Sequence, residues 1–401
     1  MKGNLPALLR EAASMTRRGL RLSGAFVAVL TLAMVRCGDA PPREGGPATF
    51  RPALVGVPGG SFLAVWGDGE GRRAFLAEGL VGVDPARVPG GQAGRLVEYQ
   101  WPGRFTTRCM ADSALWWVSG ARTAGGELVL WAVGDRGRVV RFRGERCESL
   151  STGLRFEGGD PTFWGVLAQP SGEVWVVGGS PRPDGPRGVL LRGDGASWRQ
   201  EPLPESAAQE NLYKIAADGE ALYVVGSGGL VLRREPLDGT WRRVEVRVRT
   251  SDSRLFTVSC AGGSCFAVGG SASALLMRGR GTDWAPVDRL GDTPLDELTG
   301  LNGVWARGAD DVLLVGVDGL TAHTDGRSLS FGSPRGTEAT LHAVGGFDDV
   351  ALAVGGELDN ASPSQRGVVL VRGDGASVFT LDGRQYAAPG GLLRSRGGAG
   401  Q

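Results

Sequence analysis

The sequence predicts an all-β protein folded as a single β-propeller, with seven four-stranded blades as the favoured count. The first observation is a repeat in which an apolar strand ends in glycine, a Gly-rich turn follows, and a second strand ends in Arg-Gly or Asp-Gly. Clear copies read LWAVGDRGRVVRFRG from Leu130 and LYVVGSGGLVLRREPLDGTW from Leu222. The second observation is the spacing of the later copies, roughly 39 to 49 residues. Short strands repeating at this period are typical of propeller blades.

Each blade is expected to begin with an inner strand that lines the central channel. These strands are predicted to start near Ala53, Ala114, Phe163, Asn211, Arg254, Leu301 and Thr340. The first interval, roughly 61 residues, is longer than one blade and indicates an insertion or a degenerate unit. Residues 105–120 (FTTRCMADSALWWVSG) are similar to the first two strands of a blade, which leaves eight blades as the alternative. Residues 48–50 are a candidate for the outer strand that closes the ring.

The strands and turns of the repeat have a physical explanation. Residues 174–177 (VWVV) are continuously apolar, as expected for a strand covered by neighbours on both faces. The glycine that follows, Gly178, permits the close approach or positive φ of a tight turn. Trp198, Trp241 and Trp284 each open a predicted outer strand, and we expect them to pack between adjacent blades as structural residues.

The N-terminus has the features of a secretory signal, assigned to residues 1–36. Basic residues precede an apolar run of about 14 residues from Leu22, too short for an ordinary membrane span. A start at Met15 is an alternative. The sequence LAMVRC, ending at Cys37, resembles a bacterial lipoprotein signal, with Arg36 where a small residue is usual. The resemblance implies lipid attachment to the Cys37 sulfur; a plain signal peptide with an incidental cysteine is the alternative.

The remaining domain boundaries follow from composition. Residues 37–48 are rich in Pro and Gly and are expected to form a flexible tether. The propeller is predicted over residues 49–383. The tail, residues 384–401, is rich in Gly, Arg and Ala and is expected to be disordered.

The five cysteines fit an exported protein once Cys37 is set aside. Cys260 and Cys265 flank Ala-Gly-Gly-Ser, a separation suited to a disulfide across a hairpin. Cys109 and Cys147 are then expected to pair around the second blade. Two pairs of buried thiols are the alternative, although export to an oxidising compartment favours disulfides.

Charge and motifs argue against several classes of function. The 44 basic and 43 acidic residues leave no net field to attract nucleic acid or a membrane surface. No phosphate loop, nucleophile elbow or dinucleotide fingerprint is present in the sequence. With only His323 and His342 and no metal-ligand spacing, we expect neither a transition metal nor a cofactor. A structural calcium at acidic turns such as Asp310-Asp311 is an alternative to solvated carboxylates.

Two segments carry a family resemblance. RGDGASW from Arg192 and RGDGASV from Arg372 resemble the Asp-box of BNR-repeat, sialidase-like propellers, and the whole pattern is similar to photosystem II assembly-factor-like propellers and to bacterial lipoproteins built of such repeats. The resemblance implies a structural turn rather than a catalytic element. Sialidase chemistry would need a tyrosine nucleophile and three arginines. The start TFRP at Thr49 matches that family's opening motif only in part.

Binding residues are predicted on one face of the propeller, because loops on a rigid scaffold usually carry recognition. Two long loops, residues 179–188 and 356–367, are expected to emerge there between second and third strands. Their polar residues are the first candidates for ligand binding: Arg182, Asp184, Arg187, Glu357, Asp359, Asn360, Gln365 and Arg366. Side chains expected at the channel mouth on this face are Trp164, Lys214, Trp305 and His342. Variable loops without a ligand, and a hydrogen-bonded structural histidine, are the alternatives.

Together these features predict an exported, lipid-anchored propeller that works as a non-catalytic binding or scaffold module in the bacterial cell envelope. The expected location is the outer membrane, on its periplasmic side or at the cell surface. An envelope protein, a peptide or a glycan is the expected partner, and the protein is expected to be monomeric. A carbohydrate-active enzyme with channel-mouth carboxylates is the alternative, as is a structural component that pairs with its own copies.

Overall fold

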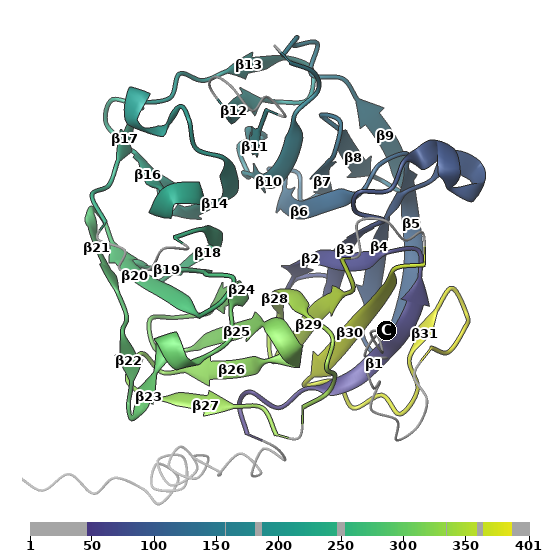
Figure 1. Ribbon diagram of the computed structural model, residues 1–401. Helices are drawn as coiled ribbons and strands as arrows, with labels where there is room; N and C mark the ends of the chain where they lie inside the picture. The colour runs from purple at the N-terminus through teal and green to yellow at the C-terminus, as the bar shows by residue number, and fades with distance from the viewer. Residues whose placement is uncertain are drawn as a thin grey trace, which may run out of the picture. The chain divides into compact units, whose positions relative to one another are not determined.

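The computed structural model describes residues 46–156, 158–180, 187–246, 253–333, 335–358 and 364–386. These residues form seven blades of antiparallel strands around a central channel, as predicted (Figure 1). The signal peptide, Cys37 and most of the tether lie outside the described residues.

Six blades have the strand order of the chain itself, from the inner strand outward. The inner strands are β2 (Ser61–Asp68), β6 (Leu115–Arg122), β10 (Thr162–Ala168), β14 (Leu212–Asp218), β18 (Leu255–Ala261), β24 (Leu301–Ala306) and β28 (Leu341–Phe347). The second strands are β3 (Arg73–Gly79), β7 (Leu128–Gly134), β11 (Val174–Gly179), β15 (Ala221–Gly226), β19 (Ser264–Gly269), β25 (Val312–Gly316) and β29 (Val350–Gly356). The third strands are β4 (Gly94–Gln100), β8 (Val139–Arg143), β12 (Gly188–Gly193), β16 (Val231–Arg234), β20 (Leu275–Arg280), β26 (Thr321–Thr324) and β30 (Arg366–Arg372). The outer strands are β5 (Arg104–Ala111), β9 (Arg146–Leu150), β13 (Trp198–Gln200), β17 (Trp241–Arg243), β21 (Asp283–Pro286), β27 (Leu329–Phe331) and β1 (Arg51–Pro58).

The ring is closed by strands from both ends of the chain. β1 pairs antiparallel with β30 and becomes the outer strand of the seventh blade. β31 (Thr380–Leu381) then pairs in parallel with β5 of the first blade. In Figure 1 the purple β1 lies beside the yellow-green β30, its partner from the other end of the chain. The prediction that Ala53 opens the first inner strand was therefore wrong: Ala53 lies in β1, and β2 is the inner strand. The closing strand begins one residue after the proposed segment 48–50.

The eight-blade alternative was also wrong. The segment 105–120 does contain two strands, but β5 ends one blade and β6 begins the next. The first blade is long because residues 80–93 connect β3 to β4 and include two short 3-10 turns, η1 (Pro85–Arg87) and η2 (Pro89–Gly91). Two connections elsewhere add a small hairpin, β22 (Arg289–Leu290) with β23 (Thr293–Pro294), and the turn η3 (Glu205–Ala207).

The predicted tryptophans pack between blades. Trp198 lies edge-on to Trp131 of the preceding blade, with ring centroids 6.0 Å apart. Trp241 meets Trp175 in the same way at 5.6 Å, and Trp284 lies 5.6 Å from Tyr223. Each contact joins an outer strand to the second strand of its neighbour. Such aromatic pairs bury large apolar surfaces, so they stabilise the seam between blades.

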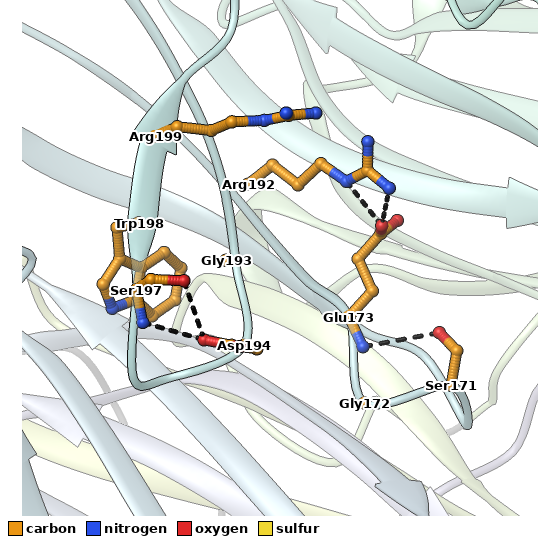
Figure 2. A pocket seen from close by; sticks show the side chains of 9 residues that line it. All are labelled: Ser171, Gly172, Glu173, Arg192, Gly193, Asp194, Ser197, Trp198 and Arg199. Atoms are coloured by element: carbon orange, nitrogen blue, oxygen red, sulfur yellow. Dashed lines mark hydrogen bonds and ion pairs between the residues drawn. The ribbon is translucent and has the colours of Figure 1, made fainter.

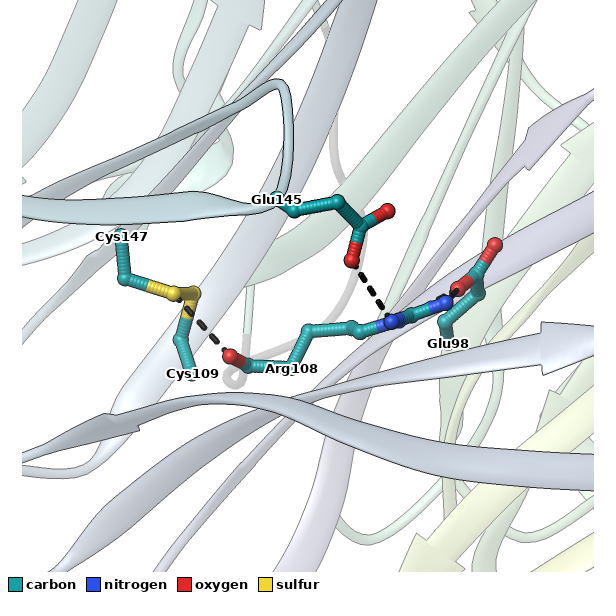
Figure 3. Close-up of a disulfide and its surroundings, with 5 residues drawn as sticks. All are labelled: Glu98, Arg108, Cys109, Glu145 and Cys147. Atoms are coloured by element: carbon teal, nitrogen blue, oxygen red, sulfur yellow. Dashed lines mark hydrogen bonds and ion pairs between the residues drawn. A yellow bond between two sulfur atoms is a disulfide. The ribbon is translucent and has the colours of Figure 1, made fainter.

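Both predicted disulfides are present. Cys260–Cys265 links paired residues of β18 and β19 within one blade. Cys109–Cys147 joins β5 to β9, so it connects the outer strands of the first two blades rather than encircling the second (Figure 3). The neighbouring Arg108 reinforces this seam, because its guanidinium bonds the buried Glu98 of the first blade at 2.5 Å and Glu145 of the second at 2.7 Å.

Candidate functional site

A cavity of about 400 Å³ lies at the channel mouth, where the inner strands begin. Every inner strand has a β-bulge at its second residue or immediately after it, seen as a register shift against the second strand. The residues skipped by the register form one ring around the cavity: Leu63, Trp116, Trp164, Tyr213, Phe256, Asn302 and His342. A bulge turns an extra side chain away from the regular alternation. Each of the seven blades therefore places the side chain of its bulge residue at the channel mouth.

Four consecutive members of this ring are aromatic. The rings of Trp164 and Tyr213 meet edge to face with centroids 5.2 Å apart. Tyr213 and Phe256 follow at 6.0 Å, and Trp116 with Trp117 line the next part of the wall. Because each ring is held by a different rigid blade, the wall is preformed. It offers flat apolar surfaces of the kind that line small-molecule and peptide pockets.

Lys214 is the cation of this cavity. Its side chain is only 8% exposed, its Nζ donates to the backbone oxygen of Trp164 at 2.6 Å, and it lies 4.2 Å from the ring centre of Trp117. Gly165 makes room for it, because a Cβ there would stand 2.8 Å from the Tyr213 oxygen and 3.1 Å from the Lys214 Cα. Burial away from water lowers the pKa of Lys214 to about 7.

Other polar residues of the cavity wall form hydrogen bonds, two of which run from one blade to the next. Thr257 Oγ1 donates to the Asn302 oxygen at 2.6 Å, and Asn302 Nδ2 donates to the Leu341 oxygen at 3.0 Å. His342 Nε2 lies 3.3 Å from the Gly356 oxygen. Burial lowers the pKa of His342 to about 4, with a smaller contribution from the charge of Lys214. The imidazole is therefore neutral at pH 7 and serves as a hydrogen-bonded wall residue.

Three of the four predicted channel-mouth residues line the cavity: Trp164, Lys214 and His342. Trp305 lies farther along β24, where it packs against the apolar cluster that includes Leu313 and Leu341, with the Arg307 guanidinium over its ring. Trp116, Tyr213 and Phe256 line the cavity but were not predicted. Their positions in the sequence could have identified them, because each immediately follows the buried leucine that opens its inner strand.

The predicted loop residues have mixed positions. Arg182, Asp184, Asp359 and Asn360 lie outside the described residues. Leu358, at the start of the second loop, is 39% exposed and lines the cavity. Gln365 is buried, and its amide clamps the backbone of Val81 in the first blade, accepting from the nitrogen at 3.0 Å and donating to the oxygen at 2.8 Å.

The other described loop residues form hydrogen bonds with neighbouring segments of the chain. The Arg187 nitrogen donates to the Ala208 oxygen at 2.8 Å. The Glu357 oxygen accepts from the Ser61 hydroxyl. Arg366 is exposed and donates to the Gly56 oxygen at 3.2 Å. Both loops nevertheless leave the blades at the channel mouth, since Gly179 begins the first beside Trp164 and Leu358 belongs to the second.

A larger hollow of about 720 Å³ lies at the outer edge of the third blade, around the Asp-box-like turn (Figure 2). Its polar groups bond one another. Glu173 pairs with Arg192, while Asp194 accepts from the backbone nitrogens of Ala196 at 2.9 Å and Ser197 at 2.8 Å. Those bonds lower the pKa of Asp194. The Asp-box-like turn and its internal bonds account for this hollow. The channel-mouth cavity differs, because it holds a buried cation, the Lys214 ammonium, among aromatic rings.

The same turn chemistry recurs at Asp325, outside the two predicted copies, and is also present at Asp374 in the second predicted copy. Asp325 accepts from the backbone of Arg327 and Ser328 at 2.9 and 2.7 Å. Asp374 accepts from Ala376 at 2.7 Å and also receives bonds from the Tyr99 hydroxyl and the Gly103 nitrogen, which dock the closing segment on the first blade. Aspartates that accept backbone bonds in this way stabilise tight turns.

The fold and this cavity define a seven-bladed β-propeller with a ligand-sized site at its channel mouth. No family model and no curated protein matches the chain. Solved structures do share the fold. YCF48 from Cyanidioschyzon merolae is 14% identical with a TM-score of 0.56, over 81% of this chain and 98% of that one.

Two further structures of the same fold come from bacteria. A catalytically inactive variant of virginiamycin B lyase from Staphylococcus aureus, solved with quinupristin, is 10% identical with a TM-score of 0.53, over 80% of this chain and 98% of that one. The extracellular domain of BT4673 from B. thetaiotaomicron is 13% identical with a TM-score of 0.53, over 80% of this chain and 39% of that one. At such identities the similarity establishes the propeller fold alone.

The described residues contain neither a metal-binding cluster nor a membrane-spanning helix. In these ranges no cluster of three or more His, Cys, Asp or Glu side chains is arranged to hold a metal ion. No helix among the described residues has the length and apolar character needed to cross a membrane. The two disulfides indicate an exported protein, because disulfides persist in oxidising compartments.

Proposed function

We propose that this protein is a non-catalytic binding module whose channel-mouth cavity receives an apolar part of a peptide or protein partner. The observation that carries the proposal is the ring of bulged residues, four of them aromatic, around a preformed cavity. A preformed apolar site costs little conformational entropy on binding, so it favours capture of a flexible segment. The flanking loops would add contacts around the entrance.

The polar groups of the cavity support binding over glycoside hydrolysis. That reaction needs two carboxylates flanking the scissile bond. Within the described part of the chain, the residues lining the cavity include neither Asp nor Glu. They include the ammonium of Lys214 and the hydroxyls and amide of Thr257, Thr340 and Asn302, which suit recognition. Tyr99, one of four tyrosines that a sialidase mechanism would draw on, is fully buried in the closing seam with its hydroxyl on Asp374.

The proposed location is the cell envelope, with a lipid on Cys37 as the anchor at the outer membrane. The disulfides support export, and the lipoprotein-like sequence at Cys37 supports the anchor. Mass spectrometry of the N-terminus of the mature protein from membrane and soluble fractions tests the anchor. A diacylated or triacylated Cys37 in membranes is expected, and an unmodified N-terminus in the soluble fraction would contradict it.

A peptide-library screen tests the binding function. Random peptides, displayed once with free and once with blocked C-termini, are screened against the wild-type protein. The best binders are then measured against Trp164→Ala and, as a matched control at the outer edge, Arg199→Ala. We expect at least about tenfold weaker binding by Trp164→Ala and no change by Arg199→Ala, because aromatic anchors dominate such sites. Binders that tolerate Trp164→Ala, or a screen without binders, would contradict the proposal.

A further inference from the structure

We propose that the cavity captures the C-terminal residue of its partner peptide, with an apolar side chain between the aromatic rings and the terminal carboxylate on Lys214. This inference rests on the proposed function and names the chemical group that the site selects. Three features carry it: the isolated positive charge, the donor geometry of the ammonium, and the size of the cavity.

The charge of the cavity favours an anion. Lys214 is the only lysine or arginine among the residues that line the cavity in the described part of the chain. The other ionisable side chains of the inner strands, apart from Tyr213 and His342, lie at or near the opposite ends: Asp68, Arg122 and Asp218. Asp135, in the turn after β7, accepts from Trp116 Nε1 at 2.8 Å and from the Thr162 hydroxyl at 3.1 Å. Among the described residues no carboxylate pairs with Lys214, and a buried ammonium in this situation gains the most from an anionic ligand.

The geometry places this charge against the rings. An ammonium has three N–H donors. The Trp164 oxygen takes one of them, and the Trp117 ring covers another side at 4.2 Å. Lys214 is itself a lining residue, so the remaining direction is available to a ligand group in the cavity. Such a charge-assisted bond is roughly twice as strong as a neutral one.

The chemistry of a chain end favours a terminal residue over an internal Asp or Glu. In a C-terminal residue the carboxylate and the side chain share one Cα, so a single residue reaches the ammonium and the adjacent rings together. An internal acidic residue would bring two flanking peptide bonds into an apolar cavity, at the cost of their hydration. A volume of about 400 Å³ is enough for one such residue, and the rest of the peptide would leave past the exposed Leu358.

Binding should weaken with rising pH. Lys214, with a pKa of about 7, loses its charge above neutral pH. His342 faces the same channel with a pKa of about 4 and stays neutral in this range. The strands packed against β14 are β10, β11, β12, β15 and β18. Their ionisable side chains are Arg192, paired with Glu173, and Tyr223, packed on Trp284. Arg254 lies at the rim over the Phe256 ring. Affinity for a carboxylate is therefore expected to fall about tenfold per pH unit above pH 7.

The test uses labelled hexapeptides Gly-Ser-Gly-Ser-Gly-X, where X is Phe, Leu, Val or Trp, each as free acid and as C-terminal amide. Fluorescence polarisation at pH 6 and pH 8.5 gives the affinities of the wild type and of Lys214→Met. N-acetyl-phenylalanine, as a competitor, distinguishes a free small acid from a peptide end. We expect the acids to bind the wild type about ten- to hundredfold more tightly than the amides at pH 6. The difference should vanish in Lys214→Met.

The outcomes separate this inference from the proposed function. Equal binding of acids and amides, both lost in Trp164→Ala, would overturn the carboxylate assignment while leaving the cavity as a binding site. Preference for acids that persists in Lys214→Met would overturn the role of Lys214. If neither form binds, the inference fails, and the library screen decides the proposed function separately. Full competition by N-acetyl-phenylalanine at the affinity of the peptide acid would overturn the peptide as the source of the carboxylate.

Discussion

The buried ammonium of Lys214 lowers the stability of the folded protein. The folded protein holds its ammonium among Trp117, Trp164 and Tyr213, and the loss of hydration lowers its pKa from 10.5 to about 7. In the unfolded chain the same amine stays protonated up to its ordinary pKa. Below pH 7 the native state therefore carries a buried charge that the unfolded state solvates. Residues of this kind are common at functional sites and uncommon elsewhere.

Lys214→Met is expected to stabilise the protein at pH 6, by on the order of 3 kcal/mol, because an apolar side chain removes the buried charge. Between pH 7 and about 10.5 the unfolded chain binds a proton that the folded protein has released, so the free energy of unfolding of the wild type rises with pH. The advantage of the variant should shrink over the same window. Thermal melts at pH 6 and pH 9.5 measure it, and a variant less stable at both would contradict the burial argument.

Gln365 shows the opposite case, a predicted ligand residue with a structural bonding pattern. Gln365→Ala would leave the buried nitrogen and oxygen of Val81 without these partners. We expect a loss of about 2–4 kcal/mol in the free energy of unfolding, since two buried peptide groups lose their bonds. The neighbouring exposed Arg366→Ala should cost about 1 kcal/mol or less. Similar denaturation midpoints for the two variants would be inconsistent with the clamp.

At the scale of the strand, the sequence predicts where the strands lie along the chain better than it predicts the direction of their side chains. Six of the seven inner strands were placed within a residue or so, because the apolar runs and their glycines repeat along the chain. The bulges were not predicted, since a bulge depends on the partner strand and not on local composition. Trp164 and His342 were assigned to the channel mouth, whereas Tyr213 and Phe256, at the equivalent bulges of their blades, were not.

The start of the first blade was misplaced for a related reason, because the strand with Ala53 belongs to the seventh blade. The segment with Ala53 is apolar enough for an inner strand, yet it completes a blade whose other strands lie more than 280 residues away along the chain. Local periodicity contains no information on which partner such a strand selects. Cys109 was likewise paired correctly by elimination, but its position on the first blade depended on the same boundary.

The two disulfides should contribute differently. Cys109–Cys147 closes a loop with a sequence separation of 38, whereas Cys260–Cys265 closes one of 5. In the loop-entropy description the longer link stabilises by about 4 kcal/mol and the shorter by about 2 kcal/mol. The double variant Cys109→Ser/Cys147→Ser should therefore show the larger drop in denaturation midpoint. Equal drops for both pairs would show that loop length does not govern their contributions.

At the scale of the whole molecule, the ring depends on its closure. β1 supplies eight residues to the seventh blade, and Ala53, Leu54 and Val57 are fully buried in the seam between the last and first blades. Without β1, the edge of β30 and that apolar seam would be exposed to water. Closure of a propeller is what removes such edges.

A chain that begins at Gly59 is therefore expected to lose the cooperative melting transition of the propeller or to associate through the open edge of β30. A chain that begins at Gly45 keeps β1 and serves as the matched control. Circular dichroism melts and size-exclusion chromatography at equal concentration distinguish the two. A monomeric Gly59 chain with an unchanged melting temperature would show that the ring does not require this strand.

The site itself is best tested by crosslinking. A benzoylphenylalanine is placed next to the anchoring residue of the tightest library peptide, and the crosslinked positions are mapped by mass spectrometry. Crosslinks are expected on β10, β14 and β18, close to Trp164, Tyr213 and Phe256, and they should disappear with an excess of unlabelled peptide. Crosslinks confined to the outer edge of the third blade, around Arg192 and Trp198, would contradict binding at the channel mouth.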